Sequence, residues 1–140
     1  MRQNMSGWSQ AECDELKKAG IADEILYYHR ALGKEEKYTA HVFIAQYASP
    51  EQLKQNWERL NDNIALLYQS NVDSLLERSN FYLCFFLPKS MNTIEKEKIE
   101  NDAYCAKKYI FVSEKELSVE EKIQRVNEKI FELTYLESQD

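Results

Sequence analysis

The stretch Asn80-Phe-Tyr-Leu-Cys-Phe-Phe-Leu-Pro88 decides the fold of this chain. Seven consecutive residues, Phe81 to Leu87, are apolar or aromatic, and Pro88 ends the run. Because apolar and polar residues do not alternate along it, both faces of the predicted strand should be buried. The run is too short for a membrane-spanning helix, which needs about 20 apolar residues. It is therefore typical of a central strand in a sheet that helices cover.

Two further segments have the composition of strands, one on each side of this run. Tyr38–Ala48 is rich in β-branched and aromatic residues, and Tyr109–Val112 is a short apolar run. Strands that alternate with helices favour right-handed crossovers. We therefore predict an α/β fold with a small, mostly parallel three-stranded sheet and covering helices. A partner chain could cover the exposed edges of such a sheet.

The longest helix is predicted between the first two strands. Ser49-Pro50-Glu51-Gln52 supplies an N-cap, a proline at the first helical position and a glutamine two residues later. The helix could reach Arg78, about 42 Å at 1.5 Å per residue, or it could break near Ser70–Asn71. Its apolar stripe has steps of four and three and comprises Leu53, Trp57, Leu60, Ile64 and Leu67.

Two helices are predicted in the C-terminal half. Asn92-Thr93-Ile94-Glu95 begins the first, on which we expect Ile94, Ile99 and Ala103 to face inward. Ser118-Val119-Glu120-Glu121 is a capping box that begins the second. The inward-facing residues of this last helix are Val119, Ile123, Val126, Ile130 and Leu133.

The N-terminal part is predicted to be helical as well. Ser9-Gln10-Ala11-Glu12 has the pattern of a capping box, and a second helix follows from Asp23 until Gly33 ends it. We therefore treat residues 1–140 as a single α/β domain in which residues 1–37 form an N-terminal helical extension.

Composition limits the classes of function. The net charge of −6 and the isoelectric point near 5.1 argue against a dedicated duplex-binding surface, which needs clustered Lys and Arg. A small basic patch would still permit DNA contact within a complex. The nine tyrosines matter because tyrosine is enriched at protein interfaces, so we expect some of them to face a partner.

Cysteine usage and the first residues bear on location. Cys13, Cys84 and Cys105 are odd in number and lack CxxC spacing, so we expect them to be reduced and partly buried. No apolar signal segment follows Met1–Ser6, and no membrane span is visible. A cytoplasmic location is the expectation.

Motifs for catalysis or cofactor binding are missing from the sequence. There is no GxSxG nucleophile motif, and no glycine pattern for a nucleotide phosphate. His29 and His41 have no Cys or carboxylate at a metal-site spacing, so we assign them structural or solvent roles. We expect no catalytic residue, no metal ligand and no cofactor.

A metal-dependent nuclease is the enzymatic alternative. It would need an acid on one strand and Glu-x-Lys on the next, close enough to hold Mg²⁺. Glu95-Lys96-Glu97-Lys98 contains Glu-x-Lys but lies on a predicted helix, Asp102 precedes a strand without acids, and Glu114-Lys115-Glu116 lies in a turn. The ligands therefore occur in the wrong places.

The segment Ile99–Ile110 places a charged cluster between an inward-facing isoleucine and a buried strand. In one interpretation it is a helix end at which the lysines oppose the helix dipole and Asp102 pairs with one of them. In the other it is a docking surface that presents Asp102, Lys107 and Lys108.

Several blocks of the sequence resemble the middle-component subunits of ABC-three-component antiviral systems, a group that overlaps the Lamassu-type systems. The resemblance covers about Ser49–Val112, and the family's basic pair is typically Arg-Lys where this chain has Lys107-Lys108. Lysine lacks the planar fork of arginine, so a bidentate contact is not expected here. The blocks are Ser49–Leu53, Asn56-Trp57, Asn80–Leu87, Ile99–Asp102 and Lys107–Ile110.

The resemblance implies a non-catalytic adaptor rather than an enzyme. Such a subunit would bind a coiled-coil or ABC-type (SMC-like) ATPase that senses DNA and would couple it to an effector, often a nuclease. An antitoxin or immunity protein that masks a toxic partner is a further alternative, since the chain is small and acidic. The residues that we expect to bind partners are Trp57, Asn80, Tyr82, Glu100, Asp102, Lys107, Lys108 and Tyr109.

Overall fold

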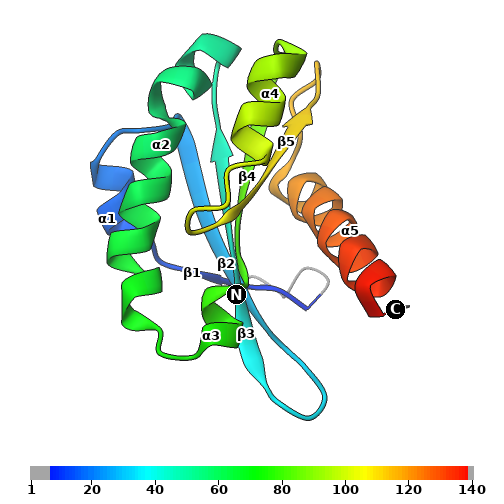
Figure 1. Ribbon diagram of the computed structural model, residues 1–140. Coiled ribbons are helices and arrows are strands. Elements are labelled where there is room, and N and C mark those ends of the chain that lie inside the picture. Colours follow the sequence, from blue (N-terminus) through cyan, green and yellow to red (C-terminus); the bar gives the residue numbers. More distant parts are fainter. Residues whose placement is uncertain (1–6, 139–140) are drawn as a thin grey trace.

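The computed structural model describes residues 7–138, with side chains as far as Ile130. Its core is one five-stranded sheet with helices on both faces (Figure 1). The strands are β1 (Ser9–Ala11), β2 (Glu24–Leu32), β3 (Tyr38–Gln46), β4 (Phe81–Leu87) and β5 (Lys107–Val112). The helices are α1 (Asp14–Lys18), α2 (Pro50–Leu67), a 3₁₀ turn (Gln69–Asn71), α3 (Leu75–Arg78), α4 (Thr93–Glu100) and α5 (Val119–Ser138).

The order of the strands in the sheet follows the sequence, β1-β2-β3-β4-β5. The first three strands pair antiparallel, and β3, β4 and β5 pair parallel. The general α/β class is confirmed, but the predicted three-stranded, mostly parallel sheet is wrong. The parallel half contains the three strands that the sequence predicted, and the antiparallel half was missed.

The antiparallel half replaces the predicted N-terminal helical extension. Ser9 lies in β1 and does not cap a helix, although a short helix does follow at α1. The segment predicted as a helix from Asp23 is β2, which pairs with β3 over nine residues. Gly33 makes the connecting turn possible: its φ is +91°, and a Cβ there would lie 2.2 Å from the Glu36 carbonyl oxygen.

The strand that decided the fold is confirmed. β4 spans Phe81–Leu87, every one of its residues is buried, and it lies between β3 and β5. Side chains on the two faces of the sheet enter two separate apolar cores, because successive residues of a strand point to opposite faces. Phe81, Leu83 and Phe85 pack on one side, whereas Tyr82, Cys84 and Phe86 pack on the other.

The helices divide between these two faces. Helices α1, α2 and α4 cover the first core with Leu16, Trp57 and Ile99 among others, and α5 covers the second with Ile123, Val126 and Ile130 (Figure 1). The inward positions predicted for α5 hold for these three residues. The side chain of Leu133 lies outside the described residues.

Helix α2 begins as predicted and ends early. The Ser49 hydroxyl accepts from the Gln52 amide, and the Gln52 side chain accepts from the Ala48 amide. The helix stops at Leu67, close to the alternative break at Ser70–Asn71 and well short of Arg78.

Helix α4 has the predicted cap but a narrower buried face. The Asn92 side chain accepts from the amides of Ile94 and Glu95. Ile99 is buried, whereas Ile94 is 76% exposed and Ala103 lies in an exposed loop after the helix. The inward orientation predicted for Ile94 and Ala103 is therefore wrong, because the helix ends at Glu100 and packs on the sheet through its last turn.

Candidate interaction surface

The residues predicted to bind partners fall into two clusters on opposite faces of the β4–β5 pair. The alternation along β5 sends Lys108 toward the core under α2 and α4, and sends Lys107 and Tyr109 toward the face of α5. We call the first group the Lys108 cluster, which comprises Trp57, Glu100, Asp102 and Lys108. The second is the Tyr82 cluster, which comprises Asn80, Tyr82, Lys107 and Tyr109.

The ammonium group of Lys108 is fully enclosed. Its Nζ donates to Asp102 Oδ1 at 2.6 Å, to the Asp102 carbonyl at 3.1 Å and to the Tyr104 carbonyl at 2.6 Å. The Lys108 side chain has no exposed surface, while that of Asp102 keeps 34%. A lysine ammonium has three donors, so Lys108 has none left for a partner molecule.

The loop between α4 and β5 is folded around this ammonium. Asp102 Oδ1 also accepts from the Tyr104 amide at 3.0 Å, and Asn61 on α2 donates to the Tyr104 carbonyl at 2.9 Å. The Trp57 ring lies 6.0 Å from Lys108 Nζ and is buried. The predicted pairing of Asp102 with one of the lysines is confirmed, but both lysines lie in β5 and not at the end of α4, which stops at Glu100. Lys108 is not presented at the surface.

Glu100 has a different partner, on the backbone of β5. Its Oε2 accepts from the Ile110 amide at 2.8 Å. That amide points away from β4, at the outer edge of the sheet. A side chain therefore occupies a position where a neighbouring strand would supply a carbonyl oxygen.

The Tyr82 cluster links β4, β5 and α5. Tyr82 stacks on Tyr109 with ring centroids 6.4 Å apart, and its hydroxyl donates to Asn80 Oδ1 at 2.8 Å. Lys107 Nζ lies 5.6 Å from the Tyr82 ring, and Lys129 Nζ of α5 lies 5.7 Å from the Tyr109 ring. Tyr82 is buried, Asn80 and Tyr109 are half-buried, and Lys107 is exposed.

A groove of about 390 Å³ runs along the outer edge of β5 between α4 and α5. It connects the two clusters, because both contribute to its lining. The lining residues are Lys96, Glu100, Asn101, Lys108, Tyr109, Ile110, Phe111 and Lys129.

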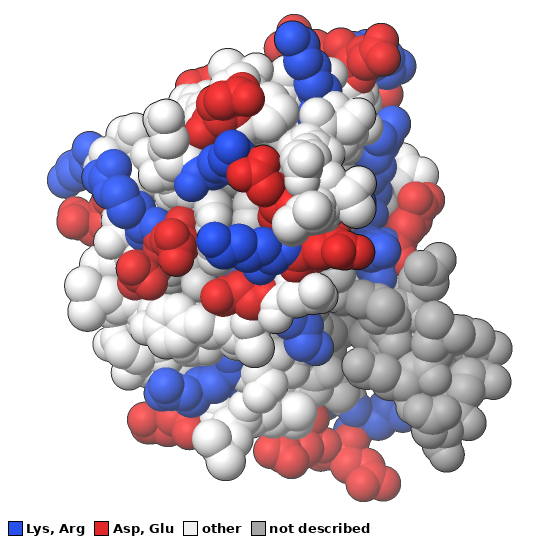
Figure 2. Space-filling model, turned by 45° about the horizontal axis from the view of Figure 1, so that its top comes forward, with Lys and Arg blue, Asp and Glu red and all other residues white. Residues whose placement is uncertain are grey.

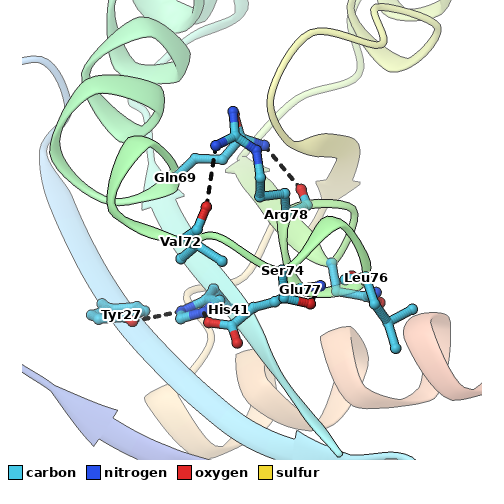
Figure 3. A network of polar contacts seen from close by, with 9 residues as sticks. Tyr27, His41, Gln69, Val72, Ser74, Leu76, Glu77 and Arg78 are labelled. Carbon is cyan, nitrogen blue, oxygen red and sulfur yellow. Dashed lines mark hydrogen bonds and ion pairs between the residues drawn. The ribbon is translucent and has the colours of Figure 1, made fainter. Parts of the chain in front are cut away.

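A buried polar network, which sequence reasoning did not find, joins β2 and β3 to α3 (Figure 3). The Tyr27 hydroxyl is 2.7 Å from His41 Nδ1, and His41 Nε2 is 2.8 Å from Glu77 Oε2. The neutral ring satisfies both contacts when Nδ1 accepts from Tyr27 and Nε2 donates to Glu77. The structural role predicted for His41 is confirmed, but its partners come from β2 and α3, which no spacing in the sequence connects.

Burial governs the protonation of this network. Desolvation lowers the pKa of His41 below its ordinary value, although the hydrogen bond to Glu77 opposes the shift. Desolvation also raises the pKa of Tyr27 to about 12, so its hydroxyl keeps its proton at neutral pH. The network therefore holds α3 against β2 and β3, and Arg78 adds a bond to the Val72 carbonyl at 3.1 Å (Figure 3).

A second hollow, about 430 Å³, lies at the carboxyl ends of the parallel strands. Ligands of α/β proteins often bind at this end of the sheet. Here the lining residues carry both signs of charge. Lys122 is buried with Nζ 3.4 Å from Glu24, and Glu114, Lys115 and Glu116 also line the hollow. The arrangement does not point to one class of ligand.

Metal sites, membrane spans and basic patches have little support among the described residues. They contain no group of three or more His, Cys, Asp or Glu side chains that could hold a metal ion. None of the described helices is both long and apolar enough to cross a membrane. Figure 2 shows acidic and basic side chains interspersed on one face, without a continuous positive patch.

Comparison with known proteins identifies a family. The family model of the ABC-three component (ABC-3C) system Middle Component 1 matches residues 40–136, which include most of β3, all of β4 and β5, and both clusters. No curated protein and no solved structure matches the chain. The match spans well over half of the sequence and confirms the resemblance seen in its motifs. The chain therefore belongs to the ABC-3C system Middle Component 1 family.

Proposed function

We propose that this component is a non-catalytic adaptor. In this proposal it binds the ABC-type ATPase of its system and couples that ATPase to an effector, within antiviral defence of the Lamassu-type group. Membership of a three-component system means that the chain acts with other components. We propose that those components are the ATPase and the effector, and that this chain couples them.

The observation that carries the proposal is how the charged residues of the matched region are used. The carboxylate of Asp102 is bound to Lys108 and to the Tyr104 amide, and Glu95 is paired with Lys54 at 2.8 Å. In contrast, Lys107 and Lys129 are exposed over tyrosine rings, beside an edge of the sheet with which no strand of the described residues pairs. Aromatic rings are enriched at protein interfaces, and exposed cations attract a partner of opposite charge.

The same contacts give a nuclease no support. Asp102 is held by Lys108, and Glu95 and Glu97 lie on α4 rather than on a strand. An Mg²⁺ site would need these carboxylates to converge without a competing cation. An antitoxin or immunity role likewise gains no specific observation, so the adaptor is the function that we propose.

Co-expression with the proteins encoded by the two flanking genes tests the proposal. We expect the tagged chain to retain the ATPase and the effector on an affinity column. Without the chain, these two proteins should elute separately. Elution of the chain as a free monomer, while ATPase and effector associate without it, would contradict the adaptor role.

A further inference from the structure

We propose that the outer edge of β5 binds an extended, acidic segment of another component of the system, which adds to the sheet as a strand beside β5. This inference rests on the proposed function, because it requires that the chain bind another component. It adds the binding surface and the chemistry of the segment that this surface takes.

The backbone of β5 has hydrogen-bonding groups that face away from β4 and could pair with such a strand. The Ser113 amide donates to Leu87 of β4 at 2.9 Å, whereas the Ile110 amide points outward to Glu100. Because hydrogen-bonding direction alternates along a strand, the amides and carbonyls of Lys108, Ile110 and Val112 face outward. Within the described part of the chain, no strand pairs with this edge.

Glu100 supplies one acceptor that a neighbouring strand would otherwise provide. Its carboxylate occupies the middle one of the three outward amides, that of Ile110. Native proteins often blunt an open edge with a charged side chain, which prevents uncontrolled pairing. An incoming strand would replace this carboxylate with a backbone carbonyl, and Glu100 would then be released to solvent at the rim of the groove.

The charges around the groove select the chemistry of the incoming segment. Lys96 of α4 and Lys129 of α5 line the groove. These two helices lie on either side of β5 (Figure 1), and Lys107 is an exposed residue at the first position of β5. None of these three lysines has an ion pair with a carboxylate among the described residues. An extended segment with Asp or Glu at alternate positions could pair its backbone with β5 and its carboxylates with the lysines.

A second copy of this chain fits the edge poorly. Two β5 strands placed side by side would bring the Lys96, Lys107 and Lys129 groups of both copies together. Like charges at an interface disfavour association and select against that partner. The acidic segment of a different component is therefore the occupant that the charges favour.

Backbone pairing is tested by Val112→Pro, with Val112→Thr as the matched control. The Val112 amide faces outward, so proline removes a donor at the free edge and leaves the ladder with β4 intact. Threonine keeps both the amide and the β-branched shape. Against the ATPase and the effector, each purified, we expect Val112→Pro to weaken the binding of one by about tenfold or more, and Val112→Thr to bind as the unaltered chain does.

A double variant, Lys96→Glu with Lys129→Glu, tests whether the charges of the groove select the partner. The control is Lys34→Glu with Lys98→Glu, which changes the net charge equally at exposed positions away from the groove. We expect the groove pair to weaken binding by about tenfold or more and the control pair to have little effect. Thermal unfolding of all variants verifies that they fold. If the proline variant does not fold, the comparison of the two charge-reversal pairs still tests the proposal.

The outcomes separate this inference from the proposed function. If the unaltered chain binds neither component, both fail. If it binds one of them and both the proline and the groove variants bind equally well, the edge is not the interface and the adaptor role stands. A concentration-dependent dimer that Val112→Pro abolishes would assign the edge to a second copy and overturn the acidic segment.

Discussion

Lys108 shows how one residue can be misassigned by its neighbours in the sequence. It follows another lysine, Lys107, and paired lysines of this kind are usually solvated. The structure instead buries its side chain completely and gives each donor of the ammonium an oxygen acceptor. A buried charge of this kind is tolerated only when it is paired and hydrogen-bonded. Its adjacent lysine, Lys107, is exposed and provides a natural comparison.

Replacing Lys108 with methionine should destabilise the chain far more than the same change at Lys107. Lys108→Met leaves the Tyr104 carbonyl and the Asp102 carboxylate without their donor, which we expect to lower the free energy of unfolding by about 2–4 kcal/mol. Lys107→Met should change it by no more than about 0.5 kcal/mol. Urea unfolding followed by circular dichroism measures both. Equal stabilities for the two variants would mean that the Lys108 cluster does not hold the loop.

His41 should make stability depend on pH. Burial lowers its pKa in the folded state, so the unfolded chain takes up the proton more readily. The free energy of unfolding should therefore be highest above the ordinary pKa of 6.5 and should fall as the pH drops below it. Protonation would also remove the acceptor that Nδ1 offers to Tyr27.

Urea unfolding between about pH 7.5 and about pH 5.5 measures this effect, above the range in which most carboxylates titrate. In His41→Gln the fall over this interval should be smaller than in the unaltered chain. His29→Gln serves as the control at a paired position of the same hairpin. The same slope in all three proteins would show that His41 does not titrate with unfolding.

At the scale of elements, α4 shows that helical periodicity does not always identify the buried face of a short helix. The sequence predicted both Ile94 and Ile99 to face inward. Ile99 lies in the core at 2% exposure, but Ile94 is largely in solvent. A helix of eight residues that contacts the sheet through its last turn buries too little for its period to define a face.

Alanine at these two positions should therefore have unequal effects. Ile99→Ala leaves a cavity in the core and should lower the free energy of unfolding by about 2–4 kcal/mol. Ile94→Ala should be neutral within about 0.5 kcal/mol, because little of the apolar area of this side chain is buried. Thermal and urea unfolding of the two variants measure the difference. A large loss at Ile94 would indicate that the exposed face of α4 is packed against something.

Strand β2 was predicted as a helix, and the reason for this error is physical. Its residues Ile25, Leu26, Tyr28 and Leu32 also fit a helical stripe, so local periodicity alone does not decide. Nine-residue pairing with β3 supplies hydrogen bonds and aromatic stacking, such as Tyr27 on Phe43 at 4.5 Å, that a helix would forgo. The missed signal was a glycine-containing turn between two segments rich in aromatic residues, which is typical of a hairpin.

At the scale of the whole molecule, the parallel half of the sheet was predictable and the antiparallel half was not. The composition of a continuous apolar strand such as β4 directly indicates that both of its faces are buried. One interpretation of the sequence was a docking surface that presents Asp102, Lys107 and Lys108 together, and the structure divides these residues between two faces. Residues adjacent in the sequence of a strand face opposite sides, so Lys107 and Lys108 belong to different clusters. No local pattern could reveal that α4 and α5 form a groove beside them.

Hydrogen–deuterium exchange of the chain, alone and in complex with the other components, tests the central claim most directly. We predict that in the complex the outward amides of Lys108, Ile110 and Val112 exchange more slowly, because they are then bonded to a strand of the other component. Amides within α2, on the covered face, should keep their rates. Unchanged exchange across β5, with new protection on another part of the chain, would contradict the account.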